Sequence, residues 1–259
     1  MSDTELLFEQ NGLLAIVTFN RPEFRNAVTW AMYDRLMEAC DTVDTSEEIR
    51  ILMLRGAGGK AFVAGTDIGQ FRSFHTPADA LEYERRLEQV ISRVESVTKP
   101  TIAAIEGYAT GAGALLALAC DLRYCTPESQ IGVPIARTLG NCLTAAHHAR
   151  LVDLIGPART KELIFRARLV SAEQAQQLGL VNEVVPAEQL YTHVQALAQE
   201  IAGHAPLTLH VTKEAIRRLQ QSRRLVQDDD LVVLAYMSED FREGVTAFLE
   251  KRAPIFRGR

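Results

Sequence analysis

Two short stretches rich in small residues are places where the backbone itself can do chemistry. In "AFVAGTDIGQF" an apolar run reaches Ala64 and Gly65, and Thr66 and Asp67 follow where a helix is expected to begin. Small residues let a ligand approach the main chain, and the first amides of a helix lack intrahelical partners. The N–H of Thr66 is therefore a candidate donor. Asp67 is a candidate general base, although an Asp in a first helical turn more often caps the helix.

The second stretch is "GYATGAGALLALACD", where Gly111, Ala112 and Gly113 predict a tight turn before an apolar helix. Two such turns can aim two N–H groups at one oxygen. The pair would form an oxyanion hole for a carbonyl that gains negative charge. Taken alone, glycines before an apolar helix also fit plain helix packing or a phosphate loop.

Several other site types do not fit the spacing. The dinucleotide fingerprint fails because Leu116 stands where a third glycine is needed, and the P-loop fails because Ala61 follows the Gly-Lys pair. His147 and His148 are adjacent, so on a helix they point about 100° apart and cannot share a metal. The cysteines form no C-x-x-C pair and are expected to be reduced core residues: Cys40, Cys120, Cys125 and Cys142. We expect no metal site.

Composition narrows the class of protein. The chain has 259 residues, a net charge of −5, 47% hydrophobic and 24% charged residues, as in ordinary globular proteins. No apolar run is long enough to span a membrane, and no dominant basic block predicts a nucleic-acid partner. The acidic start "MSDTELLFEQ" lacks a signal-peptide pattern, so we expect a cytoplasmic protein. Basic residues in 217–224 and 250–259 fit either a solvated surface or contacts to a small phosphorylated ligand.

The elements that must position the two turns follow an α/β pattern. Apolar runs predict strands at 13–20, 50–56 and 101–107. The segment 78–97 predicts an amphipathic helix, because one stripe of it carries Tyr83, Leu87, Val90, Ile91, Val94 and Val97.

Strand patterns nearly vanish after residue 140, where only 179–185 reads as extended. Helices are predicted at about 143–154, 157–166, 171–178, 187–204, 208–221 and 228–251. The sequence therefore predicts an α/β body followed by a helical C-terminal region.

Five segments, in this order and spacing, resemble the crotonase, or enoyl-CoA hydratase/isomerase, superfamily. They are "FNRPEFRNAV", "AFVAGTDIGQF", "KPTIAAIEGYATGAGALLALACDLRYCT", "GPARTKELIFRARLVSAEQAQQLGLVNEVVP" and "EGVTAFLEKRAPIF". The resemblance implies a spiral of ββα units over residues 1–200 and a helical trimerisation region over 201–259. It also implies a homotrimer or a dimer of trimers.

The resemblance further implies a ligand. An acyl-CoA thioester would place its carbonyl oxygen between the Thr66 and Ala112 amides, which would stabilise an enolate. No metal and no separate cofactor is needed, because CoA is part of the substrate. Arg25 would lie near the CoA phosphates, Ala64 and Asp67 near the adenine, and Lys251 and Phe248 would reach the CoA from the last helix.

One departure from the family concerns the acids. Hydratases of this family carry two glutamates that hold and split a water between them. Those positions are Leu115 and Ile135 here, and the run after Pro134 is one residue longer than usual. We therefore expect hydration to be slow or absent. Possible substitutes, each more readily structural, are Asn141, Cys142, Thr144 and His147.

Three functions remain open at this stage. The first is a lyase or isomerase that relies on enolate stabilisation. The second is a non-catalytic acyl-CoA binder. The third is a CoA-thioester hydrolase or isomerase that uses His147 or a carboxylate brought in from elsewhere in the chain.

Overall fold

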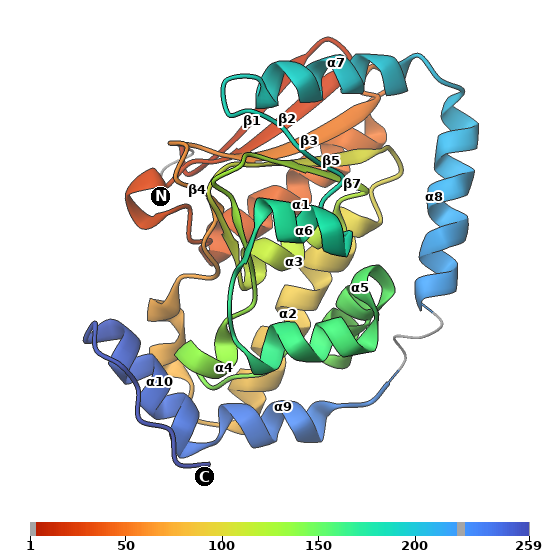
Figure 1. Cartoon of the computed structure of the whole chain (residues 1–259). Helices are drawn as coiled ribbons and strands as arrows, with labels where there is room; N and C mark the ends of the chain where they lie inside the picture. Colours follow the sequence, from red (N-terminus) through yellow and green to blue (C-terminus); the bar gives the residue numbers. More distant parts are fainter. Residues whose placement is uncertain (1–3, 222–225, 259) are drawn as a thin grey trace.

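Two β-sheets form the frame of the molecule in the computed structural model, which describes residues 4–221 and 226–258 (Figure 1). The larger sheet has the order β1 (Leu6–Asn11), β2 (Leu14–Phe19), β3 (Ile51–Gly56), β5 (Thr101–Ile105), β7 (Leu122–Cys125) and β10 (Glu183–Val184). β1 pairs with β2 antiparallel, and the remaining pairs are parallel. The strands predicted at 13–20, 50–56 and 101–107 are thus confirmed as β2, β3 and β5.

A smaller sheet accompanies the larger one. Its order is β4 (Ala61–Val63), β6 (Tyr108–Thr110), β8 (Gln130–Gly132) and β9 (Val170–Ser171). β3, β5 and β7 are each followed by a strand of this sheet and then by a helix. These helices are α2 (Pro77–Glu95), α3 (Ala112–Ala119) and α4 (Ile135–Thr138). The predicted spiral of ββα units is confirmed.

Both faces of the larger sheet are covered, which explains its unbroken apolar strands. On one face, Leu14 and Ile16 of β2 pack with Leu190 and Val194 of α7 (Leu190–Ala202). The alternate residues of the strands face the main core, to which α1 (Trp30–Thr45) and α2 contribute. α2 begins at a capping box formed by Thr76 and Asp79 and buries the predicted stripe.

The C-terminal region is helical, as expected, with differences at two breaks. The helices predicted at 143–154 and 157–166 form one element, α5 (Ala145–Phe165), interrupted at Gly156 by a φ of 73°. The single helix predicted at 228–251 is wrong in one respect. It is divided into α9 (Asp229–Tyr236) and α10 (Glu239–Leu249), because Ser238 accepts the N–H of Phe241 and starts a new helix.

The two remaining helices are α6 (Ala172–Leu178) and α8 (Pro206–Gln221). α8 runs along one side of the molecule and buries none of its side chains (Figure 1). In the described part of the chain, no helix combines the length and apolarity needed to cross a bilayer. The domain boundary at residue 200 stays a prediction.

Candidate functional site

A cavity of about 480 Å³ brings the two predicted turns together. It is bounded by the ends of β4 and β6, the middle of α2, α4 and the end of α10. All of the predicted site residues except Lys251 line it: Arg25, Ala64, Thr66, Asp67, Ala112, Leu115, Ile135 and Phe248. Lys251 is exposed just beyond α10 and is not part of the lining.

The two turn amides have no competing backbone partner. Val28 bridges the turn after β4, donating to the Gly65 carbonyl at 2.9 Å and accepting from Asp67 N–H at 3.0 Å. Neither Thr66 N–H nor Ala112 N–H donates to another backbone group of the described chain. Two such donors on one cavity can stabilise an oxygen that gains negative charge.

Glycine holds the two turns close to each other. Gly111 adopts φ 55° and ψ −124°, a conformation that side-chain-bearing residues avoid. A Cβ added at Gly113 would overlap the carbonyl oxygen of Val63, the last residue of β4. Only glycine therefore lets α3 start against β4, and this contact fixes the spacing of the Thr66 and Ala112 amides.

The Thr66 side chain is held from two helices. Its Oγ1 lies 3.0 Å from the hydroxyl of Tyr33 in α1 and 3.0 Å from that of Tyr83 in α2. Burial raises the pKa of both tyrosines, so their hydroxyls stay neutral. The three hydroxyls form a buried chain that fixes the turn and its amide.

The positions of the two family acids are apolar walls of the cavity. Leu115 lies in α3 and Ile135 begins α4, and both are buried. Neither side chain can hold a proton, so a water between them would lack a base.

A carboxylate that the sequence analysis did not single out lines the same cavity. Glu84 in α2 is only 4% exposed, and it directly follows Tyr83, which binds Thr66. Its place in the sequence carries a signal, because residues 84, 87, 91 and 94 fall on the apolar stripe of the helix. An acid within such a stripe is a candidate functional group.

The two oxygens of Glu84 have different surroundings. Oε1 accepts a hydrogen bond from Tyr236 of α9, whose oxygen in turn accepts from Asn141 Nδ2 at 3.1 Å. Oε2 is buried and accepts no hydrogen bond from the described residues, and His147 Nε2 lies 4.0 Å away. Burial raises the pKa of Glu84 to about 8, against the lowering effect of the Tyr236 hydrogen bond.

A partly buried ion pair lies one helical turn from Glu84. Arg150 of α5 binds both oxygens of Glu88 at 2.7 Å. Burial acts to raise the pKa of Glu88, but Arg150 brings it below the usual value. His147 Nδ1 lies 3.1 Å from Arg150 and 3.2 Å from Glu88 Oε2. Arg150 is thus engaged by Glu88, one helical turn beyond Glu84.

The four substitutes considered for the missing acids divide into two pairs. Asn141 and Cys142 line the cavity. Thr144 accepts the His147 N–H at 3.4 Å and caps α5, so its role is structural. His147 is fully buried and lies behind Glu84 instead of on the cavity wall.

Asp67 is a cap. Its side chain accepts from Gly69 N–H at 3.1 Å and starts the 3-10 helix η2 (Ile68–Ser73). It also pairs with Arg21 at 3.2 Å. These contacts favour the structural interpretation of Asp67 over that of a general base.

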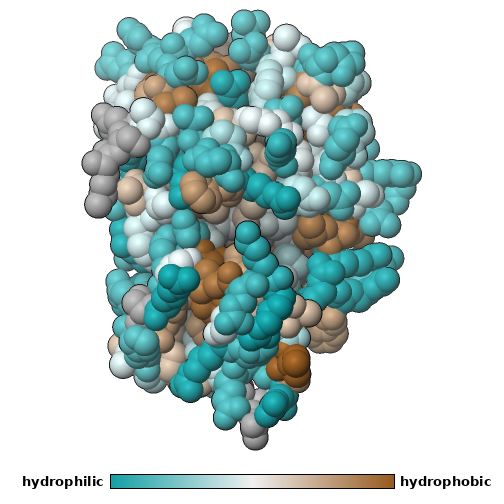
Figure 2. Space-filling model, turned by 90° about the vertical axis from the view of Figure 1, so that its left-hand side faces the viewer, coloured by the Kyte–Doolittle hydropathy of each residue, from teal (hydrophilic) through white to brown (hydrophobic). Residues whose placement is uncertain are grey.

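The mouth of the cavity combines apolar and cationic groups. Exposed Phe24, which ends the 3-10 helix η1 (Pro22–Phe24), lines it together with exposed Phe248. Arg25 stacks on the ring of Tyr108 with its guanidinium carbon 5.3 Å from the centroid. Figure 2 shows the side of the molecule on which η1 and α10 lie, with apolar surface among hydrophilic side chains.

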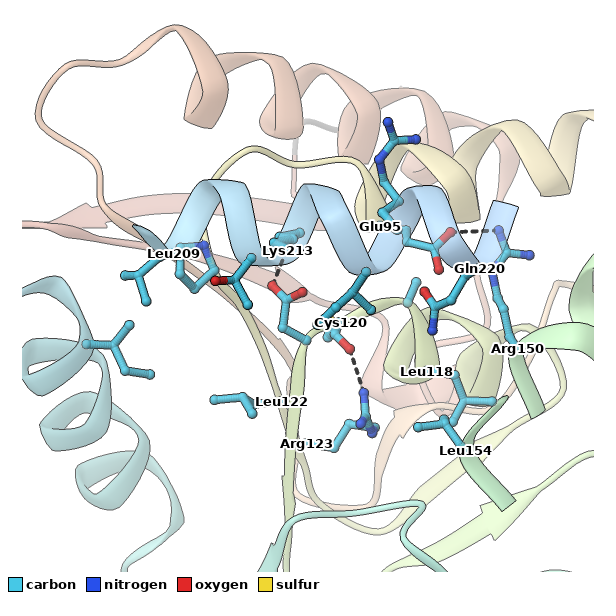
Figure 3. A pocket seen from close by; sticks show the side chains of 17 residues that line it. Glu95, Leu118, Cys120, Leu122, Arg123, Arg150, Leu154, Leu209, Lys213 and Gln220 are labelled. Carbon is cyan, nitrogen blue, oxygen red and sulfur yellow. Dashed lines mark hydrogen bonds and ion pairs between the residues drawn. The ribbon is translucent and has the colours of Figure 1, made fainter. Parts of the chain in front are cut away.

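A second cavity, of about 430 Å³, lies between α8 and the body of the protein (Figure 3). Its cationic side chains already have protein partners. Lys213 pairs with Asp121 at 2.7 Å, Arg150 with Glu95 at 3.2 Å, and Arg123 donates to backbone carbonyls. In the first cavity, the Thr66 and Ala112 amides donate to no backbone group of the described residues, and Glu84 Oε2 accepts no hydrogen bond from them. The first cavity is therefore the candidate site.

Comparisons with known proteins identify the family to which the chain is similar. The sequence profile described as enoyl-CoA hydratase/isomerase matches residues 9–259. The chain is 32% identical to the 2,3-dehydroadipyl-CoA hydratase of Escherichia coli, covering 99% of this chain and 100% of that one. It is also 32% identical to the crotonyl-CoA hydratase of Syntrophomonas wolfei, covering 99% of each. A solved structure of methylmalonyl-CoA decarboxylase in complex with 2-nitronate-propionyl-CoA is similar with a TM-score of 0.91, 30% identity and full coverage of both chains.

Proposed function

Because the chain belongs to the enoyl-CoA hydratase/isomerase family, we propose that it binds an acyl-CoA thioester and stabilises its enolate with the Thr66 and Ala112 amides. The observation that carries this proposal is a pair of amides on one cavity that donate to no backbone group of the described residues. An oxyanion-hole donor contributes about 3–4 kcal/mol to transition-state stabilisation. Arg25 and Phe248 at the mouth, with Lys251 beyond it, would contact the CoA.

The reaction we propose is a rearrangement of the acyl chain and not hydration. A hydratase must deprotonate water and protonate carbon, and the two positions that would do so are Leu115 and Ile135. General acid–base groups typically contribute about 10²–10⁴-fold each, so their loss outweighs an intact oxyanion hole.

A hydration assay tests this directly. With crotonyl-CoA, we expect loss of the enoyl-thioester absorbance to be very slow or absent. The double variant Leu115→Glu/Ile135→Glu is expected to gain activity, whereas Leu115→Gln/Ile135→Gln, of nearly the same size but without acids, is not. Hydration by the natural protein at about 10 per second or more, an ordinary enzyme rate, would contradict the proposal.

Calorimetry tests whether the protein binds acyl-CoAs, and turnover assays with the same thioesters separate an enzyme from a non-catalytic binder. Binding of several CoA thioesters is expected at micromolar to millimolar concentrations. Binding without turnover of any acyl-CoA would favour the non-catalytic binder. No heat and no competition at millimolar ligand would remove the acyl-CoA proposal altogether.

A second candidate reaction is decarboxylation of a 2-carboxyacyl-CoA, favoured by the TM-score of 0.91 to methylmalonyl-CoA decarboxylase. Breaking the bond to the carboxylate releases CO₂ and leaves its electron pair in the same enolate, which then takes a proton at the α-carbon. This step also needs no water-activating acid pair. Release of CO₂ from methylmalonyl-CoA, absent in a blank without protein, would support it.

A further inference from the structure

We propose that Glu84 is the residue that exchanges a proton with the acyl chain, in place of the two missing family acids. The inference rests on the proposed function, because it assigns a group to the enolate chemistry of the same cavity. Glu84 lines the cavity with the Thr66 and Ala112 amides, from a different wall than Leu115 and Ile135.

Burying a carboxyl group costs free energy unless the group is paired or fully hydrogen-bonded. A buried carboxylate is normally paired with a cation or fully hydrogen-bonded. Among the described residues, Oε1 of Glu84 accepts a hydrogen bond from Tyr236, whereas Oε2 accepts none and has His147 Nε2 4.0 Å away, too far for a hydrogen bond. Glu88, four residues further on, shows the contrast, because Arg150 binds both of its oxygens.

The position of Glu84 is fixed from both sides of α2. Tyr83, the preceding residue, is tied to Thr66 Oγ1, so the helix and the first amide donor move together. Tyr236 and Asn141 hold Oε1 from the other side. We regard Tyr236 as a positioning residue that orients the carboxyl group.

The residues around Glu84 also set the basicity of its carboxylate. Burial raises the pKa of Glu84 to about 8, and a catalytic base works best with a pKa near the working pH. The apolar side chains of Leu115, Ile135 and Leu87 line the same space and keep it poor in water.

The step balances with one carboxylate. The α C–H bond of the bound thioester breaks, its electron pair moves into the enolate, and the proton moves to Glu84, which becomes neutral. The two amides hold the enolate oxygen. Return of that proton to the γ-carbon of a 3-enoyl chain gives the 2-enoyl isomer. This isomerisation consumes no water and needs no second acid.

The experiment uses 3-butenoyl-CoA in D₂O with the full-length protein. Deuterium at the α-carbon is measured by mass spectrometry, and crotonyl-CoA is measured by absorbance. Glu84→Gln is expected to bind this thioester as tightly as the natural protein but to lose about 10²–10⁴-fold in exchange and isomerisation. Glu84→Asp is expected to keep part of the rate. Glu82→Gln, an exposed neighbour on α2, serves as the matched control with unchanged rates.

The outcomes separate the inference from the function on which it rests. Exchange retained by Glu84→Gln would overturn the role of Glu84, and so would binding without exchange in the natural protein. Failure of the natural protein to bind any CoA thioester would instead overturn the proposed function. Thermal unfolding of each variant identifies a loss of rate that comes from misfolding.

Discussion

Glu84 makes the stability of the protein depend on pH. Its pKa is raised from 4.5 to about 8 in the folded protein, so between these values the folded state holds a proton that the unfolded chain has lost. The free energy of unfolding therefore falls as the pH rises from about 5 to 8. Several ionisable groups lie near Glu84: Tyr33, Tyr83, Glu88, Cys142, His147, Asp228 and Tyr236.

Glu84→Gln is expected to remove this slope, because an amide cannot ionise. Urea unfolding at pH 5 and pH 8 should show that the variant gains stability relative to the natural protein as the pH rises. The neighbouring groups are present in both proteins, so their titration largely cancels in the comparison. Parallel stabilities at the two pH values would show that Glu84 is ionised in the folded state. Glu82→Gln should follow the natural protein.

At the scale of elements, the contact between α3 and β4 sets the geometry of the two amides. Gly113→Ala is expected to destabilise the fold by about 1–3 kcal/mol or more, because the new methyl group overlaps the Val63 carbonyl. The same shift should weaken binding of CoA thioesters by moving Ala112 away from Thr66. Chemical denaturation and calorimetry measure the two effects.

The control lies in the same turn. Ala112→Gly removes a methyl group and keeps the N–H, so its cost should stay near the 1 kcal/mol typical of glycine in a helix. Equal losses for the two variants would mean that the close contact at Gly113 does not control the turn.

The sequence predicts those helices and strands in which apolar residues recur over a long enough segment. The stripe of α2 and the apolar runs of β2, β3 and β5 are each visible without the rest of the molecule. The strands of the smaller sheet have two or three residues, too few for a period, and only pairing with neighbours defines them. The break at Ser238 is hidden because the apolar pattern continues from α9 into α10.

The site also has a part that the sequence predicts and a part that it does not. The Thr66 and Ala112 amides are predictable because runs of glycine and small residues are visible in the sequence. Glu84 acquires its setting from Tyr236, which is 152 residues away in the chain. No local sequence pattern predicts the contact between Glu84 and Tyr236. The sequence does show an acidic residue on the apolar stripe of a predicted helix, which marks Glu84 as a candidate.

At the scale of the whole molecule, α8 predicts self-association. It buries no side chain, and Leu207 and Val211 are 77% and 62% exposed on one stripe. Exposed apolar side chains on such an uncovered helix are typical of a subunit interface. Together with the family resemblance, this leads us to expect trimers or pairs of trimers.

Analytical ultracentrifugation at micromolar concentration tests the prediction. The natural protein should sediment as a trimer or hexamer, and Leu207→Glu/Val211→Glu should shift it toward monomer. Thr208 is exposed on the same helix and is already polar, so Thr208→Glu should leave the assembly unchanged. A monomeric natural protein would contradict this expectation.

The placement of Glu84 on α2 also has a stereochemical meaning. An enolate is planar, and a single base on one wall of a cavity reaches only one of its two faces. The two hydrogens of an α-methylene group are then no longer equivalent, and only one of them exchanges with solvent. The chirality of the labelled carbon would thus record which wall of the cavity carries the base.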